Sequence, residues 1–314
     1  MNYTPAQTIP EGEYQLAAYA YGKDYHDVMK ARLRELMAVI ASLQPRPRPL
    51  SLREGTGWGC FVDTAPVLER YWAVQAGLGW TGRNHQLIIP RAGSMFFLGE
   101  IFLPCEVDAY DHPMPSRCGN CHRCLDACPT HAIREGEPFD AHRCLSYQLI
   151  ENRRQLSPEA CRVMGDTIYG CDRCQTVCPW NRFASPNTET AFQPSPDLLA
   201  MTKKDWQRLT ADDYRRLFKG SAVKRAKYEG LMRNIERHSS TATAETRPPV
   251  SPTPAERNWR KSHRSRKGFF PQIPPPFFLC PLVFYPYLCS MNGTIIGLLL
   301  PFVGTILGSS FVFS

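Results

Sequence analysis

The chain has 314 residues and a formal net charge of +8, so it is long enough for more than one domain with a core of its own. Its thirteen cysteines would suggest disulfides in a secreted protein, but the polar, proline-containing N-terminus carries no signal peptide. Clustered cysteines without a secretion signal indicate metal binding in a reducing compartment. We therefore expect a cytoplasmic, metal-binding protein rather than a disulfide-stabilised one.

Residues 1–110 are predicted to form an α/β segment. Apolar residues at helical spacing predict a helix over Asp24–Leu43. We expect a short strand over Gly59–Val62 and a second helix over Pro66–Gly77. Two further strands are predicted at His85–Pro90 and Ser94–Leu103, joined by a turn.

A glycine-rich loop, Gly77–Asn84, lies between the second helix and the strand that follows it. Glycines at this density would let the backbone approach a flat or bulky ligand closely. A tight turn between helix and strand is an equally good interpretation. Because the loop does not follow a predicted strand, we reject a dinucleotide-binding fingerprint, and the chain contains no Walker A sequence.

Seven of the thirteen cysteines lie in two runs around which the chain is organised. The first run, Cys118–Pro129, has the spacing C-x2-C-x2-C-x3-C-P of bacterial ferredoxins. The second, Cys171–Pro179, ends in the same way, but Ile168 stands where its leading cysteine would be. In this pattern the leading cysteines hold one cluster and the last reaches the other, so the sequence predicts two 4Fe–4S clusters.

The crossed pattern assigns one cluster to Cys118, Cys121, Cys124 and Cys178. It assigns the other to Cys128, Cys171 and Cys174 and leaves one ligand position open. Cys144 and Cys161 are both candidates for that position, and spacing alone does not choose between them. A zinc ribbon is the alternative for paired C-x2-C units, but zinc does not need the C-x3-C-P endings. We therefore favour iron–sulfur clusters, which supply low-potential electrons.

Residues 195–236 are predicted to be helical and basic, with helices over Asp205–Phe218 and Ala222–Glu236 that are separated at 219–221. The second helix and its end carry Lys224, Arg225, Lys227, Arg233 and Arg237. Such a row of charges is either a solvated surface or a contact for nucleic acid.

The composition changes again after residue 237. Residues 238–267 are rich in Ser, Thr, Pro and Arg, which predicts a disordered basic linker. Residues 268–314 carry no charge, and Ile295–Phe313 has the length of a membrane span. This apolar tail is either a membrane tail or a segment foreign to the fold, such as a shifted or fused reading frame. We favour the second interpretation, and expect a membrane partner only if the tail is native.

From about Tyr14 to Asn234 the chain resembles the epoxyqueuosine reductases. The resemblance rests on both cysteine runs and on Gly22–His26, Val62–Arg70, Gly77–Asn84, Arg143–Tyr147 and Gly220–Lys227. With the patterns above, it implies an α+β fold. A partial α/β cobalamin-binding catalytic domain at 1–110 precedes a double-cluster ferredoxin-like domain at 111–190 and a basic helical segment at 191–237. The linker and the apolar tail follow.

The resemblance implies reduction of epoxyqueuosine to queuosine in a tRNA anticodon loop, with cobalamin supplied with electrons by two 4Fe–4S clusters. The expected partners are tRNA and a low-potential electron donor, and the expected state is a monomer. The family normally has a further N-terminal segment and often C-terminal helical repeats, so we expect a shortened N-terminus and an atypical tail. The alternatives are an iron–sulfur electron carrier or inactive fragment, and a reductive dehalogenase-like corrinoid enzyme.

The resemblance also implies residue roles. Asp63 matches the family's proton donor and lies at the corrinoid, whereas on sequence alone it is better read as the N-cap of the next helix. Cys144 matches the eighth cluster ligand, ahead of Cys161. Further positions that match the corrinoid pocket are His26, Asn84, Ser146 and Asp172.

Overall fold

The computed structural model describes residues 1–5, 12–43, 59–103 and 109–241. Most of the predicted linker and the whole apolar tail therefore lie outside the described residues. Within these ranges, no helix is both long enough and apolar enough to cross a membrane. The same ranges contain mixed helix and short strand, including three two-stranded sheets, in agreement with the expected α+β class.

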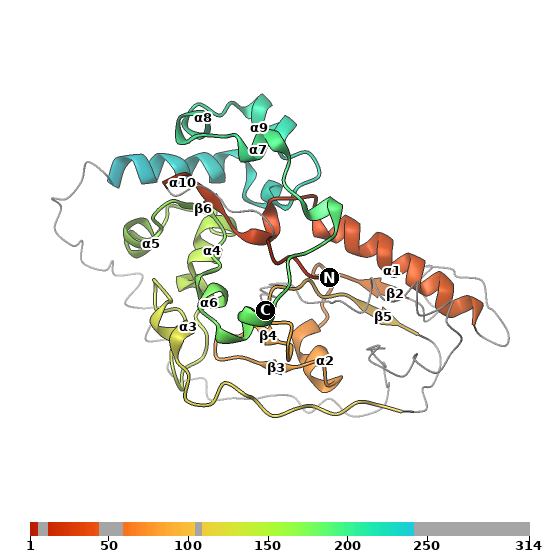
Figure 1. Cartoon of the computed structure of the whole chain (residues 1–314). Helices are drawn as coiled ribbons and strands as arrows, with labels where there is room; N and C mark the ends of the chain where they lie inside the picture. The colour runs from red at the N-terminus through yellow and green to blue at the C-terminus, as the bar shows by residue number, and fades with distance from the viewer. Residues whose placement is uncertain (6–11, 44–58, 104–108, 242–314) are drawn as a thin grey trace.

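Helix α1, Tyr25–Ser42, is the longest element of the N-terminal part and agrees with the predicted helix to within one residue at each end. Asp24 is its N-cap, and the Asp24 side chain accepts the backbone N–H of His26 at 3.0 Å. The buried face follows the i, i+4 spacing of Tyr25, Met29, Leu33, Met37 and Ala41. This face packs on strands β2 and β5 (Figure 1).

Strand β2, Gly59–Phe61, pairs antiparallel with β5, Glu100–Phe102, so that Phe61 lies opposite Glu100. Strand β3, Trp80–Thr81, pairs antiparallel with β4, Leu87–Ile88, and α2, Glu69–Gln75, packs against both. These strands are shorter than predicted. Helix α2 also begins later than predicted, because the chain between β2 and α2 makes tight turns such as Thr64 N–H to Val62 O at 2.5 Å.

The glycine-rich loop serves the β3–β4 hairpin. A Cβ on Gly79 would stand 2.0 Å from the carbonyl oxygen of Ile88, which is closer than any real contact. Gly77 has a φ of +68°, and a Cβ there would lie 2.8 Å from the carbonyl oxygen of His112. Close backbone approach within the protein explains these glycines, which favours the tight-turn interpretation over a ligand cradle.

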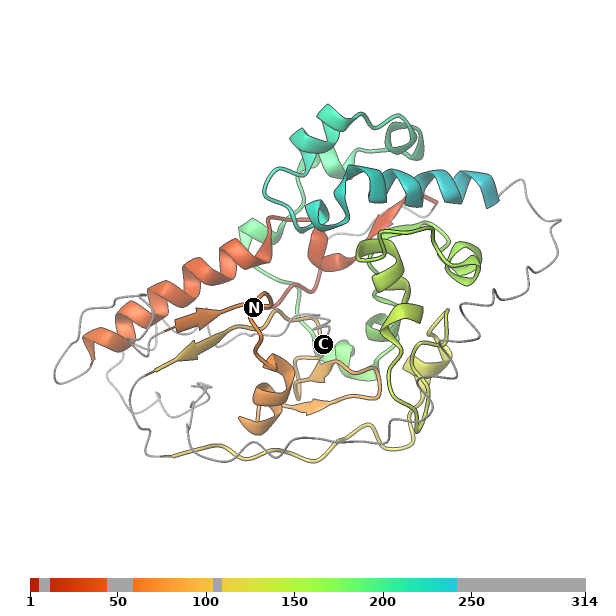
Figure 2. The same cartoon turned by 180° about the vertical axis from the view of Figure 1, so that it is seen from behind.

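The cluster region consists of short elements. Its helices are α3, Arg123–Asp126, α4, Leu145–Ile150, α5, Pro158–Val163, and α6, Arg173–Thr176. Strand β6, Thr167–Tyr169, pairs in parallel with β1, Gln15–Leu16, near the N-terminus. Figures 1 and 2 show this N-terminal strand lying beside the cluster region. The described residues also contain short 3-10 helices at Ala18–Ala20, Ala141–Arg143, Pro179–Phe183, Thr190–Phe192 and Ala222–Ala226.

The C-terminal helices are α7, Pro196–Leu199, α8, Lys203–Gln207, α9, Ala211–Leu217, and α10, Lys227–Thr241. The prediction of one helix over 205–218 is wrong. The Thr210 side chain accepts the backbone N–H of Asp213 at 3.1 Å and starts α9 afresh after α8 has ended. The predicted break before residue 222 is confirmed, with Gly220 at a φ of +69°.

The main hydrophobic core joins distant parts of the chain. It contains Leu16 from β1, Tyr169 from β6 and Leu231 from α10, all at most 5% exposed. Asn234 is fully buried beside it and donates to the carbonyl oxygens of Leu149 and Ile168 at 2.9 and 2.8 Å. The residues predicted as separate segments thus share one core, and their division into domains stays a prediction.

Candidate active site

Asp63 lies just after β2, where the chain turns towards α2. Its φ of 55° is in the left-handed region, which is uncommon for a residue with a side chain. The N-cap position of α2 is occupied by Leu68, so the reading of Asp63 as the N-cap is wrong. The Asp63 side chain is 24% exposed and is therefore within reach of a bound molecule.

Two side chains of α1 meet the Asp63 carboxyl group at the same oxygen. The Tyr25 hydroxyl donates to Asp63 Oδ2, and His26 Nε2 lies 3.2 Å from that oxygen. The Tyr25 ring is fixed by stacking on Phe97, with ring centroids 4.3 Å apart and planes within 5° of parallel. The start of α1 therefore presents a hydroxyl and an imidazole to Asp63.

Asp24 supports His26 from the other side. His26 Nδ1 lies 2.7 Å from Asp24 Oδ1, the oxygen that also caps α1. Burial lowers the pKa of His26, but hydrogen bonds to Asp24 and Asp63 outweigh it and raise the pKa to about 9. At neutral pH the imidazole is thus protonated, and it holds a proton directly beside Asp63.

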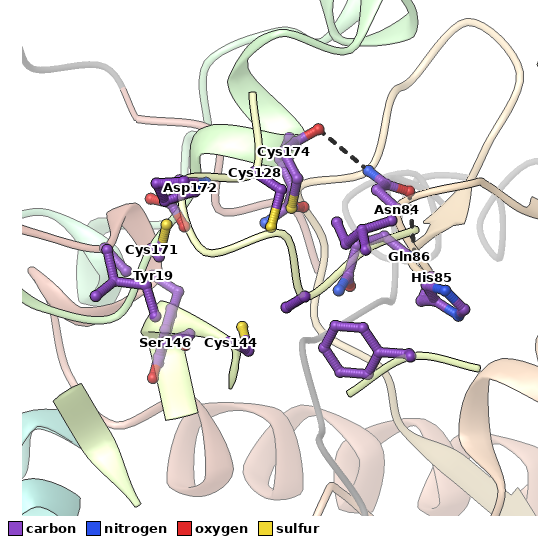
Figure 3. Close-up of a pocket in the computed structure, with 17 residues that line it drawn as sticks. Tyr19, Asn84, His85, Gln86, Cys128, Cys144, Ser146, Cys171, Asp172 and Cys174 are labelled. Carbon is purple, nitrogen blue, oxygen red and sulfur yellow. Dashed lines mark hydrogen bonds between the residues drawn. The ribbon is translucent and has the colours of Figure 1, made fainter. Parts of the chain in front are cut away.

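A pocket lies next to this group, and four cysteine side chains form one of its walls. The sulfur atoms of Cys128, Cys144, Cys171 and Cys174 point into it (Figure 3). Three of the residues expected at a corrinoid, Asn84, Ser146 and Asp172, also line it (Figure 3).

His26 and Asp63 are not among the described lining residues of this pocket. Tyr19, which does line it, meets Tyr25 edge-on with ring centroids 5.9 Å apart. The structure thus brings three of the expected corrinoid contacts to the pocket and places His26 with Asp63, one aromatic pair away. The motif Gly22–His26 includes Asp24 and Tyr25, but the sequence assigned a role to neither residue. Their contacts with His26 and Asp63 form only in the folded chain.

The polar side chains of the pocket are themselves held in place. Asp172 Oδ2 accepts the backbone N–H of Ala18 at 2.6 Å. Burial raises the pKa of Asp172 to about 6, although this hydrogen bond opposes the rise. Asn84 donates from Nδ2 to the carbonyl oxygen of Cys174 at 3.3 Å, which ties the glycine-rich loop to the second cysteine run.

Cysteines that raise one another's pKa lie close together in the structure. Burial raises the pKa of Cys174, and Cys171, Cys144 and Cys128 raise it further. Likewise, burial raises the pKa of Cys171 to about 12, with Cys144 adding to the rise. These cysteines form the inner group, and Cys144 supplies its fourth thiol.

The remaining cysteines form a separate, outer group. Burial raises the pKa of Cys124 to about 11, with further contributions from Cys178 and Cys118. Burial also raises the pKa of Cys178, and Cys118 and Cys121 add to it. The last cysteine of each run therefore lies with the group of the other run, as crossed ligation requires.

Local structure explains how these thiols are presented. Each run contains a one-turn helix, α3 or α6, which carries Cys124 or Cys174 and is followed by the last cysteine of the run. Cys144 is the N-cap residue of α4; burial raises the pKa of its thiol, and the backbone N–H groups of Tyr147 and Ser146 oppose the rise. Cys161 lies on α5, where Arg237 and Arg233 act on it instead. The fold thus favours Cys144 over Cys161 for the ligand position that the spacing of the cysteines left open.

The described cysteines are free thiols, and the described residues contain no group of three or more Cys, His, Asp or Glu close enough to hold a single metal ion. A cluster of four irons has ligands that stand farther apart than those of one ion. Two groups of four buried or half-buried thiols fit that chemistry, because binding to iron removes the protons that burial otherwise favours. The four inner sulfur atoms point into one common space, which such a cluster would fill, and Asn84, Ser146 and Asp172 line that same space.

The basic residues after the clusters are used in two ways. Arg233 donates to the carbonyl oxygens of Asn152 and Gln148, and Arg225 pairs with Glu151 at 2.7 Å. These arginines therefore hold α10 and its surroundings together. The lysines of this stretch, Lys224 and Lys227, are exposed.

Comparison with known proteins agrees with these groupings. A family model described as a 4Fe-4S double cluster binding domain matches residues 117–181. A second, described as epoxyqueuosine reductase QueG, DUF1730, matches residues 1–64. An epoxyqueuosine reductase of Cellulophaga algicola is 43% identical over 236 residues, which cover 75% of this chain and 74% of that relative. The chain belongs to the epoxyqueuosine reductase family.

Other relatives extend the match. An epoxyqueuosine reductase of Escherichia coli is 39% identical over 246 residues, which cover 75% of this chain and 61% of that protein. The structure of epoxyqueuosine reductase from Streptococcus thermophilus superposes with a TM-score of 0.65 at 27% identity, covering 78% of this chain and 63% of that one. A crystal structure of the enzyme with an epoxyqueuosine-modified tRNA-Tyr stem loop gives a TM-score of 0.61 at 27% identity, covering 76% of this chain and 60% of that one.

This chain therefore spans 74% of the length of the Cellulophaga relative and 63% of the Streptococcus structure. The predicted family and the predicted pair of iron–sulfur clusters are confirmed by these matches.

Proposed function

We propose that the chain reduces epoxyqueuosine in tRNA to queuosine, using electrons that pass through its two 4Fe–4S clusters. The observation that carries this proposal is the position of Asp63. It accepts hydrogen bonds from Tyr25 and His26, one aromatic pair away from a pocket walled by the inner cysteines. A proton source and an electron source would thus lie on the two sides of the Tyr19–Tyr25 pair, and reductive removal of an oxygen requires both.

The arrangement of the cysteines gives the electrons a direction. The inner group faces the pocket, and the outer group is attached to it through the crossed last cysteines, Cys128 and Cys178. Electrons would enter at the outer cluster and leave at the inner one. The inner cluster would fill the space between its four thiols, and a cobalamin beside it would be held by Asn84, Ser146 and Asp172, which line the same space. When bound, cobalamin supplies a low-potential metal centre that acts on the epoxide carbon.

The protonation steps belong to Asp63 and His26. Loss of the epoxide oxygen as water takes up a pair of electrons and a pair of protons. Asp63 would deliver a proton to the departing oxygen, and the protonated His26 beside it would replace that proton. Asp24 makes this possible, because it stabilises the charged imidazole.

The tRNA would approach over the basic surface of the C-terminal helices. Support comes from the similarity to the enzyme solved with a modified tRNA stem loop and from the exposed lysines Lys224 and Lys227. Contacts of lysine with phosphate give salt-sensitive affinity without sequence information. A modified base in a single-stranded loop can be splayed out into a pocket.

The test is an anaerobic reaction of the cluster-loaded protein with cobalamin, a low-potential reductant and tRNA that carries epoxyqueuosine, followed by nucleoside analysis. We expect epoxyqueuosine to disappear and queuosine to appear in equal amounts. Unchanged epoxyqueuosine with intact clusters would overturn the proposal. In that case a corrinoid titration separates the remaining readings: no spectral change leaves a plain electron carrier, and a change with turnover of organohalides indicates a dehalogenase-like enzyme.

A further inference from the structure

A pair of buried glutamates lies behind Asp63. Glu100, on β5, is 6% exposed, and Glu69, at the start of α2, is 4% exposed. The β2–β5 register sets Glu100 opposite Phe61, two residues before Asp63. Neither carboxyl oxygen of Glu100 has a hydrogen-bond partner within the described part of the chain.

Among the described residues, no cation is found to act on Glu100. The side chain of Glu100 lies on the face of β5 that also carries Phe102, because residues two apart in a strand share a face. From β2 the paired residue is Phe61. The charged groups that act on Glu100 are Glu69 and then Asp63, and both are acidic.

An unpaired charge is expensive in such a place, whereas a neutral carboxyl group is tolerated. Burial, followed by Glu69 and Asp63, raises the pKa of Glu100 to about 9. Glu100 is therefore protonated at neutral pH.

Glu69 is placed differently, because it has a donor. Glu69 Oε1 accepts the backbone N–H of Asp63, and the half-buried guanidinium of the next residue, Arg70, interacts with Glu69 and Asp63. Asp63 benefits from such a contact, because a left-handed backbone is unfavourable for a residue with a side chain and persists when its surroundings enforce it.

We propose that Glu69 is the positioning residue of Asp63: its carboxylate binds the Asp63 backbone N–H and holds the carboxyl group against Tyr25 and His26, while Glu100 stays neutral beside it. The proposal rests on the proposed role of Asp63 as proton donor. It assigns separate tasks to two buried acids. Glu69 works as an anion, and Glu100, whose carboxyl oxygens have no hydrogen-bond partner in the described part of the chain, adds no charge beside it.

Hydrogen exchange tests the positioning directly, without cofactors or turnover. Glu69→Met removes the acceptor at nearly constant volume, and Glu69→Gln keeps a weaker one. We expect exchange in the peptide that contains Asp63 to be at least tenfold faster in Glu69→Met, and to be largely restored in Glu69→Gln. Exchange at the wild-type rate in Glu69→Met, with the rest of the protein equally protected, overturns the proposal.

Kinetics provide the second arm. Glu69→Met should lower kcat at least tenfold with KM for the substrate tRNA changed less than twofold, and Glu69→Gln should recover part of kcat. A rise in KM with kcat unchanged contradicts a positioning role. If the wild-type protein reduces no epoxyqueuosine, the proposed function fails, whereas the exchange result still decides the role of Glu69.

The protonation of Glu100 has its own readout. Infrared spectra at pH 7 should contain the carbonyl stretch of a buried protonated carboxyl group, which Glu100→Gln removes and Glu69→Gln leaves. A carboxyl pKa raised from 4.5 to about 9 costs stability progressively as the pH rises between those values. The Tm of Glu100→Gln should therefore exceed that of the wild type by an amount that grows from pH 5 to pH 9. The exposed control Glu236→Gln should show no such growth, and equal behaviour of both variants contradicts a neutral Glu100.

Discussion

The two groups of cluster cysteines and the Asp63 site are built in opposite ways. Seven of the eight cluster cysteines come from two runs whose spacing repeats, with one-turn helices α3 and α6 in equivalent places, and Cys144 lies between the runs. At Asp63, each contact joins residues of unrelated spacing: Tyr25 and His26 from a helix start, and Glu69 from the next helix. Two similar clusters need two similar sets of ligands, so the sequence shows the same cysteine spacing twice. A single proton donor such as Asp63 is recognised only by its contacts in the fold.

The largest expected effect concerns the ligand that spacing left open. Replacing Cys144 with Ser should remove the inner cluster, because its thiol stands with Cys128, Cys171 and Cys174. Iron should fall from about eight to about four per chain, and reduction of epoxyqueuosine should be lost. Iron analysis and visible absorption check this. Cys161→Ser is the matched control, and loss of iron there instead would exchange the two roles.

Asp63→Asn should have the next largest effect. It keeps the shape of the side chain but removes the acid, so kcat should fall roughly 10²- to 10⁴-fold while iron content and corrinoid binding stay unchanged. Single-turnover assays with modified tRNA measure this. Asp212→Asn, at a carboxyl group that is 88% exposed, is the control and should retain full activity. Full activity in Asp63→Asn would return Asp63 to a structural role.

Asp24→Asn separates the charge of Asp24 from its capping role, since asparagine also caps helices. Without the carboxylate, the pKa of His26 should fall from about 9, and activity should decline at a lower pH than in the wild type. Below pH 6 the two proteins should differ little, because His26 is protonated in both. The pH profile of kcat decides, and superimposable profiles would disconnect Asp24 from proton supply.

The smallest effect is expected on the basic surface. The double variant Lys224→Ala/Lys227→Ala should weaken tRNA binding by a few-fold at moderate salt, and the salt slope should fall by about one for each phosphate that the variant no longer binds. The kcat at saturating tRNA should not change. Binding measured over a salt series checks this, with the exposed Lys204→Ala on α8 as control. Equal weakening by the control would indicate a general charge effect and not a defined binding surface.

Sequence reasoning recovered the parts that depend on local pattern. Helix α1 followed from its apolar spacing, and the cluster cysteines followed from a spacing that few other sites share. The single helix predicted over 205–218 failed because periodicity continued through Thr210, where a side-chain cap starts a new helix. The role of Asp63 came only from family resemblance, since Asp before Thr-Ala-Pro is also a good cap sequence.

What could not be predicted depends on contacts across the fold. Glu100 is the one charged residue of the otherwise apolar run Met95–Leu103, and only the fold shows that it is buried near another acid. Asp24 appears as a helix cap in sequence, and its second task becomes visible when the imidazole of His26 turns back onto it. Residues of this kind cannot be recognised by a fixed spacing in the sequence, because their partners lie at arbitrary distances along the chain.

The pairing of β1 with β6 has a consequence for the order in which the protein matures. Strand β6 ends two residues before Cys171, and it is fixed from one side by Gln15–Leu16 and from the other by Asn234 of α10. The ribosome makes the first of these supports near the start of the chain and the second near residue 234. Because α10 completes the support of β6, we expect iron insertion at the inner group to follow the synthesis of α10.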